Sequence, residues 1–292
     1  MTGIPAFSPS KNTRSVPILT ESSSGQEHPE CTDEAGRVVR FLEEQAHKRD
    51  QRHVNLQLVR ALKLQHGQRW LEVGSGSGAL CRMAALRLLP DGRLVGVDID
   101  RGIVAISRGL LNTVTRLNCL DVLPADGQEL PFSTGSFDGA FAARLLLNSD
   151  HPDEVLQEMV RVVRPEGRVL AMDWDFETFV VDHSQKELTR RILLWRADNY
   201  GSNSCSGRQL YARFRRAGLE RVRLKAVVTA GYSEEDALPD ALRRAAAAAL
   251  TAGALSKDEH DGWVEEIQRM LAAKTFFASI VYYIACGIVP AR

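Results

Sequence analysis

The sequence predicts an α/β fold in which a mostly parallel β-sheet carries helices on both faces. Short apolar runs rich in β-branched residues alternate with helical patterns between residues 69 and 174. Such alternation is typical of βαβ units, whose crossovers place helices on both faces of the sheet. A glycine-rich turn joins the first of these strands to the helix that follows it. The longest apolar run, residues 275–289, is too short to span a membrane and is interpreted as a buried strand.

The periodicity assigns seven strands to the core and interrupts them with two helical lid insertions. The expected strands are residues 69–74, 93–98, 115–120, 136–142, 168–174, 222–230 and 277–287. The expected helices between the strands are residues 79–89, 102–113, 153–163 and 207–217. The insertions cover about residues 176–205 and 233–274, with helices expected at 185–198, 234–255 and 257–274. Insertions at strand ends are common sites of substrate specificity.

The N-terminal segment divides into a polar tail and a helical cap. Residues 1–32 are rich in Ser, Pro, Thr and Glu, which predicts a flexible tail, although part of it could also fold over a bound ligand. Residues 33–66 repeat apolar side chains at helical spacing, and we expect two cap helices with a break near residues 49–53. Residues 67–292 would then form the core with its insertions.

Composition and charge exclude several classes of protein. Lys plus Arg and Asp plus Glu both number 37, so the global charge argues against a nucleic-acid partner or an anionic membrane. The five cysteines are scattered without a C-x-x-C pair, which indicates reduced thiols in a cytoplasmic protein, with no zinc site and no disulfide framework. The N-terminus lacks the apolar region of a secretory signal. The oligomeric state is left open, a homodimer included.

The glycine-rich turn at residues 71–78 indicates a site for a nucleotide-type cofactor. Glycine tolerates positive φ and has no side chain, so the backbone can turn sharply and approach a ligand closely. The helix after the turn directs its free N–H groups at that ligand. Gly74, Gly76 and Ala79 fit the dinucleotide pattern G-x-G-x-x-G/A. The same turn, with Glu72 before it, also fits E-x-G-x-G-x-G, so two cofactors remain open at this point.

Downstream segments resemble the class I S-adenosylmethionine-dependent methyltransferases. Residues 125–132 (ADGQELPF) and 135–138 (GSFD) resemble the stretch in which that family has an Asp-Ala pair followed by Leu-Pro-Phe and Ser-Phe-Asp. Residues 158–168 resemble its turn into the fifth strand, usually Arg-Pro-Gly-Gly, with Glu166 in place of one glycine. E-x-G-x-G-x-G is the first motif of this family. The resemblance covers about residues 67–175 and implies a Rossmann-like fold, S-adenosylmethionine as cofactor, and an enzyme similar to the ubiquinone–menaquinone and natural-product methyltransferases.

The resemblance also implies roles for individual residues. Gly74 and Gly76 would let the backbone pass under the methionine part of the cofactor, and Glu72 would orient that loop. Asp98 would accept hydrogen bonds from both ribose hydroxyls. Arg144 would hold the methionine carboxylate, or it would be a surface ion-pair partner. Together with the residues expected around adenine, the predicted cofactor-binding set is Glu72, Gly74, Ser75, Gly76, Asp98, Ile99, Asp126, Gly127 and Arg144.

Direct displacement at a methyl group needs a general base only if the acceptor must lose a proton. The candidate bases are His151, Asp173, Asp175 and His183. His151 follows the fourth strand, where it could instead belong to a helix start, and His183 could face water in the insertion. Asp173 and Asp175 end the fifth strand on one side of it, and they could instead cap the insertion. No metal-ligand triad is present, so a cation-dependent mechanism is not expected.

Aromatic residues gather at the end of the fifth strand and in the insertions, and they include Trp174, Trp195, Trp263, Phe176 and Phe179. They fit either the core of a helical cap or the wall of a pocket for a flat acceptor. The acidic flanks of Trp174 could also attract an amine.

The leading hypothesis is methyl transfer to a small, flat aromatic or indolic natural-product metabolite. The alternatives are an NAD(P)-dependent oxidoreductase that uses the same glycine turn, a quinone-pathway C-methyltransferase, and a non-catalytic binding module. A Tyr-x-x-x-Lys pair of the short-chain dehydrogenase type is absent after the fourth strand, which argues against the oxidoreductase. The acidic residues Glu72, Asp98 and Asp126 argue against the non-catalytic module.

Overall fold

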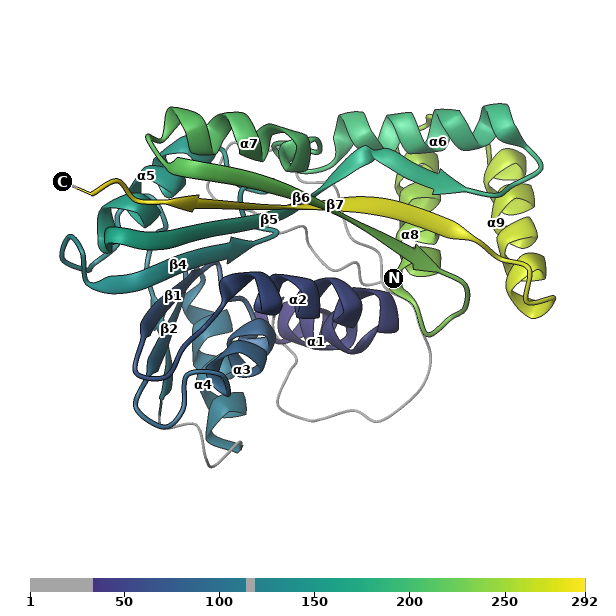
Figure 1. Ribbon diagram of the computed structural model, residues 1–292. Coiled ribbons are helices and arrows are strands. Elements are labelled where there is room, and N and C mark those ends of the chain that lie inside the picture. The colour runs from purple at the N-terminus through teal and green to yellow at the C-terminus, as the bar shows by residue number, and fades with distance from the viewer. Residues whose placement is uncertain (1–33, 114–118, 292) are drawn as a thin grey trace.

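A computed structural model describes residues 34–113 and 119–291 of the chain (Figure 1). A seven-stranded sheet runs through the molecule in the order β3-β2-β1-β4-β5-β7-β6. Helices α1 to α4 lie on one side of the sheet, and α5 and α7 lie on the other (Figure 1). The seven-stranded α/β prediction is therefore confirmed.

The strands match the predicted set in number and order. They are β1 (Arg69–Val73), β2 (Arg93–Asp98), β3 (Leu120–Pro124), β4 (Phe137–Ala143), β5 (Val163–Val181), β6 (Glu220–Gly231) and β7 (Ala278–Ile288). Strands β1 to β5 pair in parallel, and β7 pairs antiparallel with both β5 and β6. The sheet is mostly parallel for this reason.

The helices within the described residues surround this sheet. They are α1 (Glu34–His47), α2 (Arg49–Leu62), α3 (Ala79–Ala85), α4 (Arg101–Thr113), α5 (Pro152–Val162), α6 (Lys186–Asn199), α7 (Ser206–Arg216), α8 (Ala237–Thr251) and α9 (Lys257–Ala272). No helix in the described part of the chain is long and apolar enough to cross a membrane.

The two N-terminal helices break at Lys48, and not within residues 49–53 as the periodicity predicts. Lys48 has extended backbone angles (φ −58°, ψ 138°), and its Nζ donates to the backbone oxygen of Glu234 at 2.8 Å. Arg49 already belongs to α2 and forms an ion pair with Asp236. Contacts with the start of α8 thus fix the break. The tail predicted for residues 1–32 lies outside the described residues.

Two strand boundaries differ from the prediction. Strand β3 begins at Leu120, because its residues pair with β2 from Leu94↔Leu120 to Asp98↔Pro124; most of the strand expected at residues 115–120 lies outside the described residues. Strand β5 extends from Val163 to Val181, well beyond residues 168–174, because β7 continues to pair with it as far as Val181↔Ala278. The first insertion therefore begins as a strand.

Two helix boundaries also differ, while the predicted cap of α9 is confirmed. Helix α3 ends at Ala85, earlier than residue 89. Helix α8 begins at Ala237, so that Pro239 lies in its first turn, where no intrahelical N–H is needed. At α9 the Ser256 hydroxyl accepts from the Glu259 backbone N–H, and the Glu259 carboxylate accepts from the Ser256 N–H. This is the predicted capping box.

The hydrophobic core fixes the N-terminal helices against the strands that carry the glycine turn. Val54, Leu58 and Leu62 of α2 are fully buried in the same cluster as Trp70 of β1. Burial of such side chains contributes roughly 1.5–3 kcal/mol each. The C-terminal ends of β1, β2, β4 and β5 are thereby held beneath helices from both ends of the chain, which is where an open parallel sheet binds its ligands.

Candidate functional site

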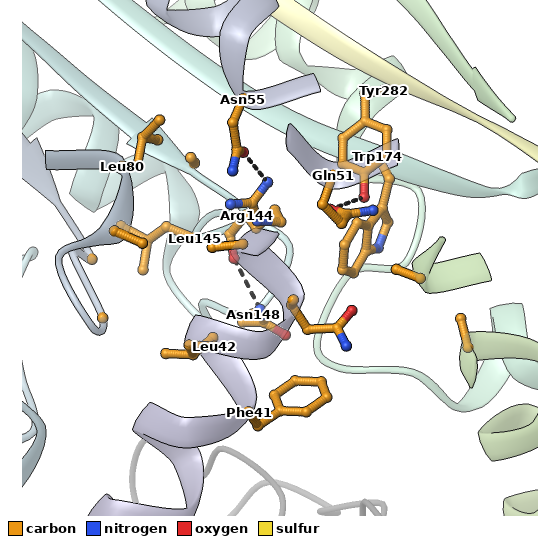
Figure 2. Close-up of a pocket in the computed structure, with 18 of the residues that line it drawn as sticks. Phe41, Leu42, Gln51, Asn55, Leu80, Arg144, Leu145, Asn148, Trp174 and Tyr282 are labelled. Carbon is orange, nitrogen blue, oxygen red and sulfur yellow. Dashed lines mark hydrogen bonds between the residues drawn. The ribbon is translucent and has the colours of Figure 1, made fainter. Parts of the chain in front are cut away.

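A cavity of about 270 Å³ lies at this end of the sheet (Figure 2). Its wall combines the glycine turn with side chains of α1, α2, β5, α6, α8 and β7, and Figure 2 shows ten of the lining residues by name: Phe41, Leu42, Gln51, Asn55, Leu80, Arg144, Leu145, Asn148, Trp174 and Tyr282. Residues separated by more than two hundred positions in the sequence therefore line the same cavity.

A smaller hollow of about 70 Å³ adjoins the cavity and shares Gly74, Asp98, Leu145 and Asn148 with it. Ile99, Asp126 and Gly127 also line the hollow. The remaining members of the predicted cofactor set line the main cavity: Glu72, Ser75, Gly76 and Arg144. The structure thus brings the whole predicted set together along one continuous surface, although its binding role stays a prediction.

The glycine turn needs glycine at the positions closest to the cavity. Gly74 and Gly76 have φ of 74° and 52°, a region that side chains rarely adopt. A Cβ atom at Gly74 would lie 2.8 Å from Leu145 Cδ1, and one at Gly76 would lie 2.9 Å from Leu42 Cδ1. The backbone N–H groups of Gly74 and Ser75 donate to Val97 at 2.8 and 2.9 Å, which fixes the turn to β2. Ser75 Oγ is buried without a partner among the described residues and can donate to a ligand there.

Asp98 ends β2 beneath the turn and is only 4% exposed. Its Oδ2 accepts from the Gly76 N–H at 2.8 Å, and its Oδ1 accepts from the Asp100 N–H at 3.1 Å. Burial raises the pKa of this carboxyl, and the backbone hydrogen bonds oppose that shift. The carboxylate is therefore held in one orientation, with its remaining lone pairs available to a diol.

Glu72 is the second buried acid of the cavity and is 2% exposed. The Cys81 thiol donates to its Oε2 at 2.7 Å. Burial raises the pKa of Glu72 to about 8, because desolvation outweighs the Cys81 hydrogen bond and the attraction of Arg144 and Arg82. At neutral pH this side chain is largely protonated and can donate as well as accept.

Arg144 faces the cavity and makes no ion pair with the described residues (Figure 2). Its Nη1 donates to Asn55 Oδ1 at 2.9 Å, and its own backbone has a positive φ of 57°. The backbone is held by a bond from the Arg144 N–H to the Met172 oxygen at 2.7 Å. The surface ion pair considered as an alternative is not observed.

The predicted bases at the end of β5 point away from the cavity, and Trp174 between them lines it instead. Asp173 is buried and accepts from Ser206 Oγ at 2.6 Å; burial raises its pKa to about 7. Asp175 is buried and accepts two hydrogen bonds from the Arg208 guanidinium. Alternation along the strand places the two carboxylates on one side and Trp174 on the other, as expected, but it is the Trp174 indole that faces the cavity.

Neither predicted histidine lines the cavity. His151 occupies the N-cap position of α5, where its side chain is 56% exposed and lies 3.4 Å from Glu154. His183 is buried and stacks on Trp263 at 5.0 Å between ring centroids. Its Nδ1 accepts from the Gln185 N–H and its Nε2 donates to the Trp263 oxygen, so both ring nitrogens are engaged in packing the insertion.

The wall of the cavity also contains aromatic side chains that the sequence indicated and two arginines that it did not. Trp174, Phe176 and Tyr200 form one aromatic cluster on its wall, with centroids 4.6 to 5.9 Å apart. Arg196 of α6 and Arg244 of α8 complete this side. Both interpretations of the aromatic residues hold in part, because Trp174, Phe176 and Phe179 line the cavity whereas Trp195 and Trp263 pack within the core of the insertions.

Comparison with known proteins agrees with this site. Residues 71–171 match the family described as "Methyltransferase domain". The chain is 27% identical over 248 residues to an uncharacterized 37.1 kDa protein in transposon TN4556 of Streptomyces fradiae, covering 84% of this chain and 70% of that protein. It is 32% identical over 108 residues to the ubiquinone/menaquinone biosynthesis C-methyltransferase UbiE of Pseudomonas paraeruginosa, covering 37% of this chain and 42% of that relative.

A structural comparison gives the same fold. A SAM-dependent methyltransferase from Aquifex aeolicus superimposes with a TM-score of 0.52 at 14% identity, covering 86% of this chain and 96% of that one. The fold and the site therefore define a nucleoside-cofactor enzyme of the methyltransferase class. More particularly, residues 71–171 match the methyltransferase family, and the chain has the fold of an S-adenosylmethionine-dependent methyltransferase, which implies S-adenosylmethionine as the cofactor.

The residues present fit this cofactor. The glycines leave space that a Cβ atom would fill, and Ser75 Oγ is an unpartnered buried donor beside them. Asp98 offers a carboxylate suited to a ribose diol, and the half-exposed Ile99 offers an apolar surface in the smaller hollow for a base. The dinucleotide alternative is not favoured by the comparisons.

Proposed function

We propose that the protein transfers a methyl group from S-adenosylmethionine to a small, flat aromatic acceptor. The observation that carries the proposal is the single cavity in which the glycine turn and the aromatic cluster of Trp174, Phe176 and Tyr200 face the same space. Bound S-adenosylmethionine supplies an electrophilic methyl group on a positively charged sulfur. The indolic natural product of our hypothesis is one member of this class of acceptor.

In the proposed site, Asp98, Gly74, Gly76 and Ser75 hold the cofactor, and Arg144 binds its carboxylate. The aromatic cluster holds the ring of the acceptor, because flat rings pack on aromatic faces and edges at the spacings seen among Trp174, Tyr200 and Tyr282. Alignment of this kind can lower a bimolecular barrier by roughly 7–11 kcal/mol. Positioning is therefore the main contribution that we assign to the protein.

We assign no general base to the acceptor side of the cavity. His151, His183, Asp173 and Asp175 do not line it. The Tyr282 hydroxyl donates to Gln51 Oε1 at 3.0 Å, and burial raises the pKa of this phenol, so it stays protonated at neutral pH. The proposed acceptor accordingly reacts through an atom that is already nucleophilic, such as a ring nitrogen with a free lone pair, or an electron-rich ring carbon that releases its proton to solvent after the transfer.

A quinone-pathway C-methyltransferase is the second candidate. It is supported by the similarity to UbiE, although that similarity covers 42% of the relative. The matched family region ends at residue 171, before α6 and α8, which line the acceptor side of the cavity. A screen for transfer of a radiolabelled methyl group over aromatic, indolic and quinone-precursor metabolites would separate the two candidates.

Binding of S-adenosylhomocysteine, measured by calorimetry, tests the cofactor site directly. We expect Asp98→Ala to weaken it by about tenfold or more, because hydrogen bonds to a charged group are worth roughly 1.5–3 kcal/mol. Asp121→Ala is the matched control, since Asp121 ends in solvent with a 64% exposed side chain on the neighbouring strand β3. Absence of binding to the wild-type protein, or equal binding by D98A, would contradict the proposal.

A further inference from the structure

Two arginines on the acceptor side of the cavity have no acidic partner. Arg196 lies on α6 and Arg244 on α8, two helices that pack against each other, and both side chains line the cavity. Neither guanidinium forms a hydrogen bond or an ion pair with any described residue. Their contacts are instead with ring faces: Arg196 lies 4.0 Å from the Tyr200 centroid, and Arg244 lies 5.2 Å from that of Phe41.

The carboxylates that could neutralise these arginines are engaged elsewhere. Asp240 of α8 attracts Arg244 electrostatically, but its carboxylate pairs with Lys48 at 3.2 Å and with Arg243 at 2.5 Å. The acids that line the described cavity, Glu72 and Asp98, belong to the turn and strand ends assigned to the cofactor. Both carboxyl groups of the cavity thus lie at the cofactor end, together with Arg144, whereas the charged side chains at the acceptor end are the guanidinium groups of Arg196 and Arg244.

An unpaired guanidinium in a partly dehydrated wall is energetically costly. Burial lowers the pKa of Arg196 to about 10 and also lowers that of Arg244, while each neighbouring cation adds repulsion. Contact with an aromatic face compensates such a charge by only roughly 0.5–2 kcal/mol. By contrast, Arg82, Arg213 and Arg243 each have a carboxylate partner.

We propose that the methyl acceptor carries an oxyanion group, a carboxylate or a phosphate, which binds between Arg196 and Arg244 while its ring packs on Trp174 and Tyr200. The guanidinium fork matches both groups in geometry and charge. Trp174 adds an independent observation, because its Nε1 is buried without a partner in the same wall and can donate to an acidic acceptor. The amine considered from the sequence is disfavoured, because the acids that flank Trp174 face away from the cavity.

This inference rests on the proposed function, and its test starts from protein saturated with S-adenosylhomocysteine. The probes are naphthalene-2-carboxylate, indole-3-carboxylate and 2-naphthyl phosphate, each titrated calorimetrically, with the two carboxamides and 2-naphthylmethylamine as neutral and cationic counterparts. We expect at least one acid to bind about tenfold or more tightly than its counterparts, as a charge-assisted pair implies. The ratio between the Kd values of the carboxylate and phosphate probes then identifies the oxyanion that the site prefers.

Substitutions of Arg196 and Arg244 test whether these side chains cause the preference for acids. Arg196→Gln and Arg244→Gln should each weaken binding of the acid by about tenfold and remove its preference over the amide. Arg196→Lys and Arg244→Lys should retain part of that preference, because lysine keeps the charge but not the guanidinium fork. Binding of S-adenosylhomocysteine should remain within about twofold of wild type in all of them. Arg190→Gln is the matched control, because Arg190 lies on α6 with a 64% exposed side chain outside the cavity and should change nothing.

Several results would overturn the inference: no acid binds to the cofactor complex, the amides bind as tightly as the acids, or the Gln variants keep the preference. The wild-type comparison of acid with amide decides the matter even if a variant fails to fold. Failure of S-adenosylhomocysteine to bind would instead overturn the proposed function. Intact cofactor binding without a preference for acids overturns only the inference made here about the acceptor.

Discussion

At the scale of single residues, two buried acids make stability depend on pH. Burial raises the pKa of Glu72 to about 8 and that of Asp173 to about 7, above their unfolded values near 4. A raised carboxyl pKa means that the folded state binds more protons between the two values. The contribution of these groups to the free energy of unfolding is therefore fully present below about pH 4, and it is lost as pH rises toward 8.

We expect the free energy of unfolding to fall between pH 5 and pH 7 by up to about 1.4 kcal/mol per pH unit for each of the two groups. Urea unfolding across this range measures the slope. Glu72→Gln should flatten it, since an amide does not titrate. A slope that E72Q leaves unchanged would show that Glu72 does not titrate in this window.

Gly76 allows a second prediction at this scale. Gly76→Ala forces a residue with φ of 52° to carry a Cβ atom 2.9 Å from Leu42 Cδ1, so the Leu42 side chain of α1 must move. Gly67→Ala is the matched control, with φ of 77° and nothing within 4 Å of the added atom. Backbone strain should lower the free energy of unfolding of both variants by about 1–2 kcal/mol. Only G76A should also weaken S-adenosylhomocysteine binding. Equal effects of the two variants on calorimetric affinity would contradict the assignment of the turn.

At the scale of elements, the ion pair of Arg49 and Asp236 joins α2 to the start of α8. The Asp236 side chain is buried, and its oxygens accept from Arg49 at 3.0 and 2.7 Å and from the Tyr232 N–H at 2.8 Å. These partners hold the pKa of Asp236 below its usual value against the opposing effect of burial. A depressed carboxyl pKa contributes stability above its unfolded value, and this stability is lost as pH falls through the folded value.

Asp236→Asn should lower the free energy of unfolding by roughly 1–3 kcal/mol, because the buried amide cannot accept all the N–H hydrogen bonds that the carboxylate accepts, while the freed Arg49 side chain is 57% exposed and stays hydrated. Asp261→Asn should cost much less, because Asp261 pairs with Lys257 on the exposed face of α9, where solvent screens the pair. Chemical denaturation of both variants measures the difference. Similar losses of unfolding free energy in the two variants would mean that the ion pair of Arg49 and Asp236 does not hold α8 in place.

The elements also show what the sequence could predict. Periodicity and turn residues were sufficient for the order and number of strands, because local patterns determine them. They misplaced β3 and the ends of β5, whose limits depend on pairing with β2 and β7. The residues of the proposed cofactor set could be named from the sequence because they lie in short local motifs that follow successive strands. Arg196 and Arg244 could not, since their role arises only when α6 and α8 pack over the cavity.

At the scale of the whole molecule, α1 lines the cavity and is tied to the glycine turn beside it. Arg82 donates to both oxygens of Glu43 on α1 at 2.6 Å and to the Ser77 backbone oxygen at 2.9 Å. Leu42 of α1 contacts the cavity beside Gly76. A ligand on the turn should therefore stabilise α1 as well as the strands beneath it.

Hydrogen exchange can measure this coupling. At a concentration of S-adenosylhomocysteine one hundredfold above its Kd, a segment whose opening requires release of the ligand gains about 2.7 kcal/mol, or roughly one hundredfold slower exchange. We expect protection of this order in the turn and α1, and little in α7, which packs on the opposite side of the sheet (Figure 1). Glu43→Gln should reduce the protection of α1 while leaving that of the turn, because it weakens the link through Arg82. Equal protection of α1 in E43Q and wild type would show that the helix responds to the ligand by direct contact instead.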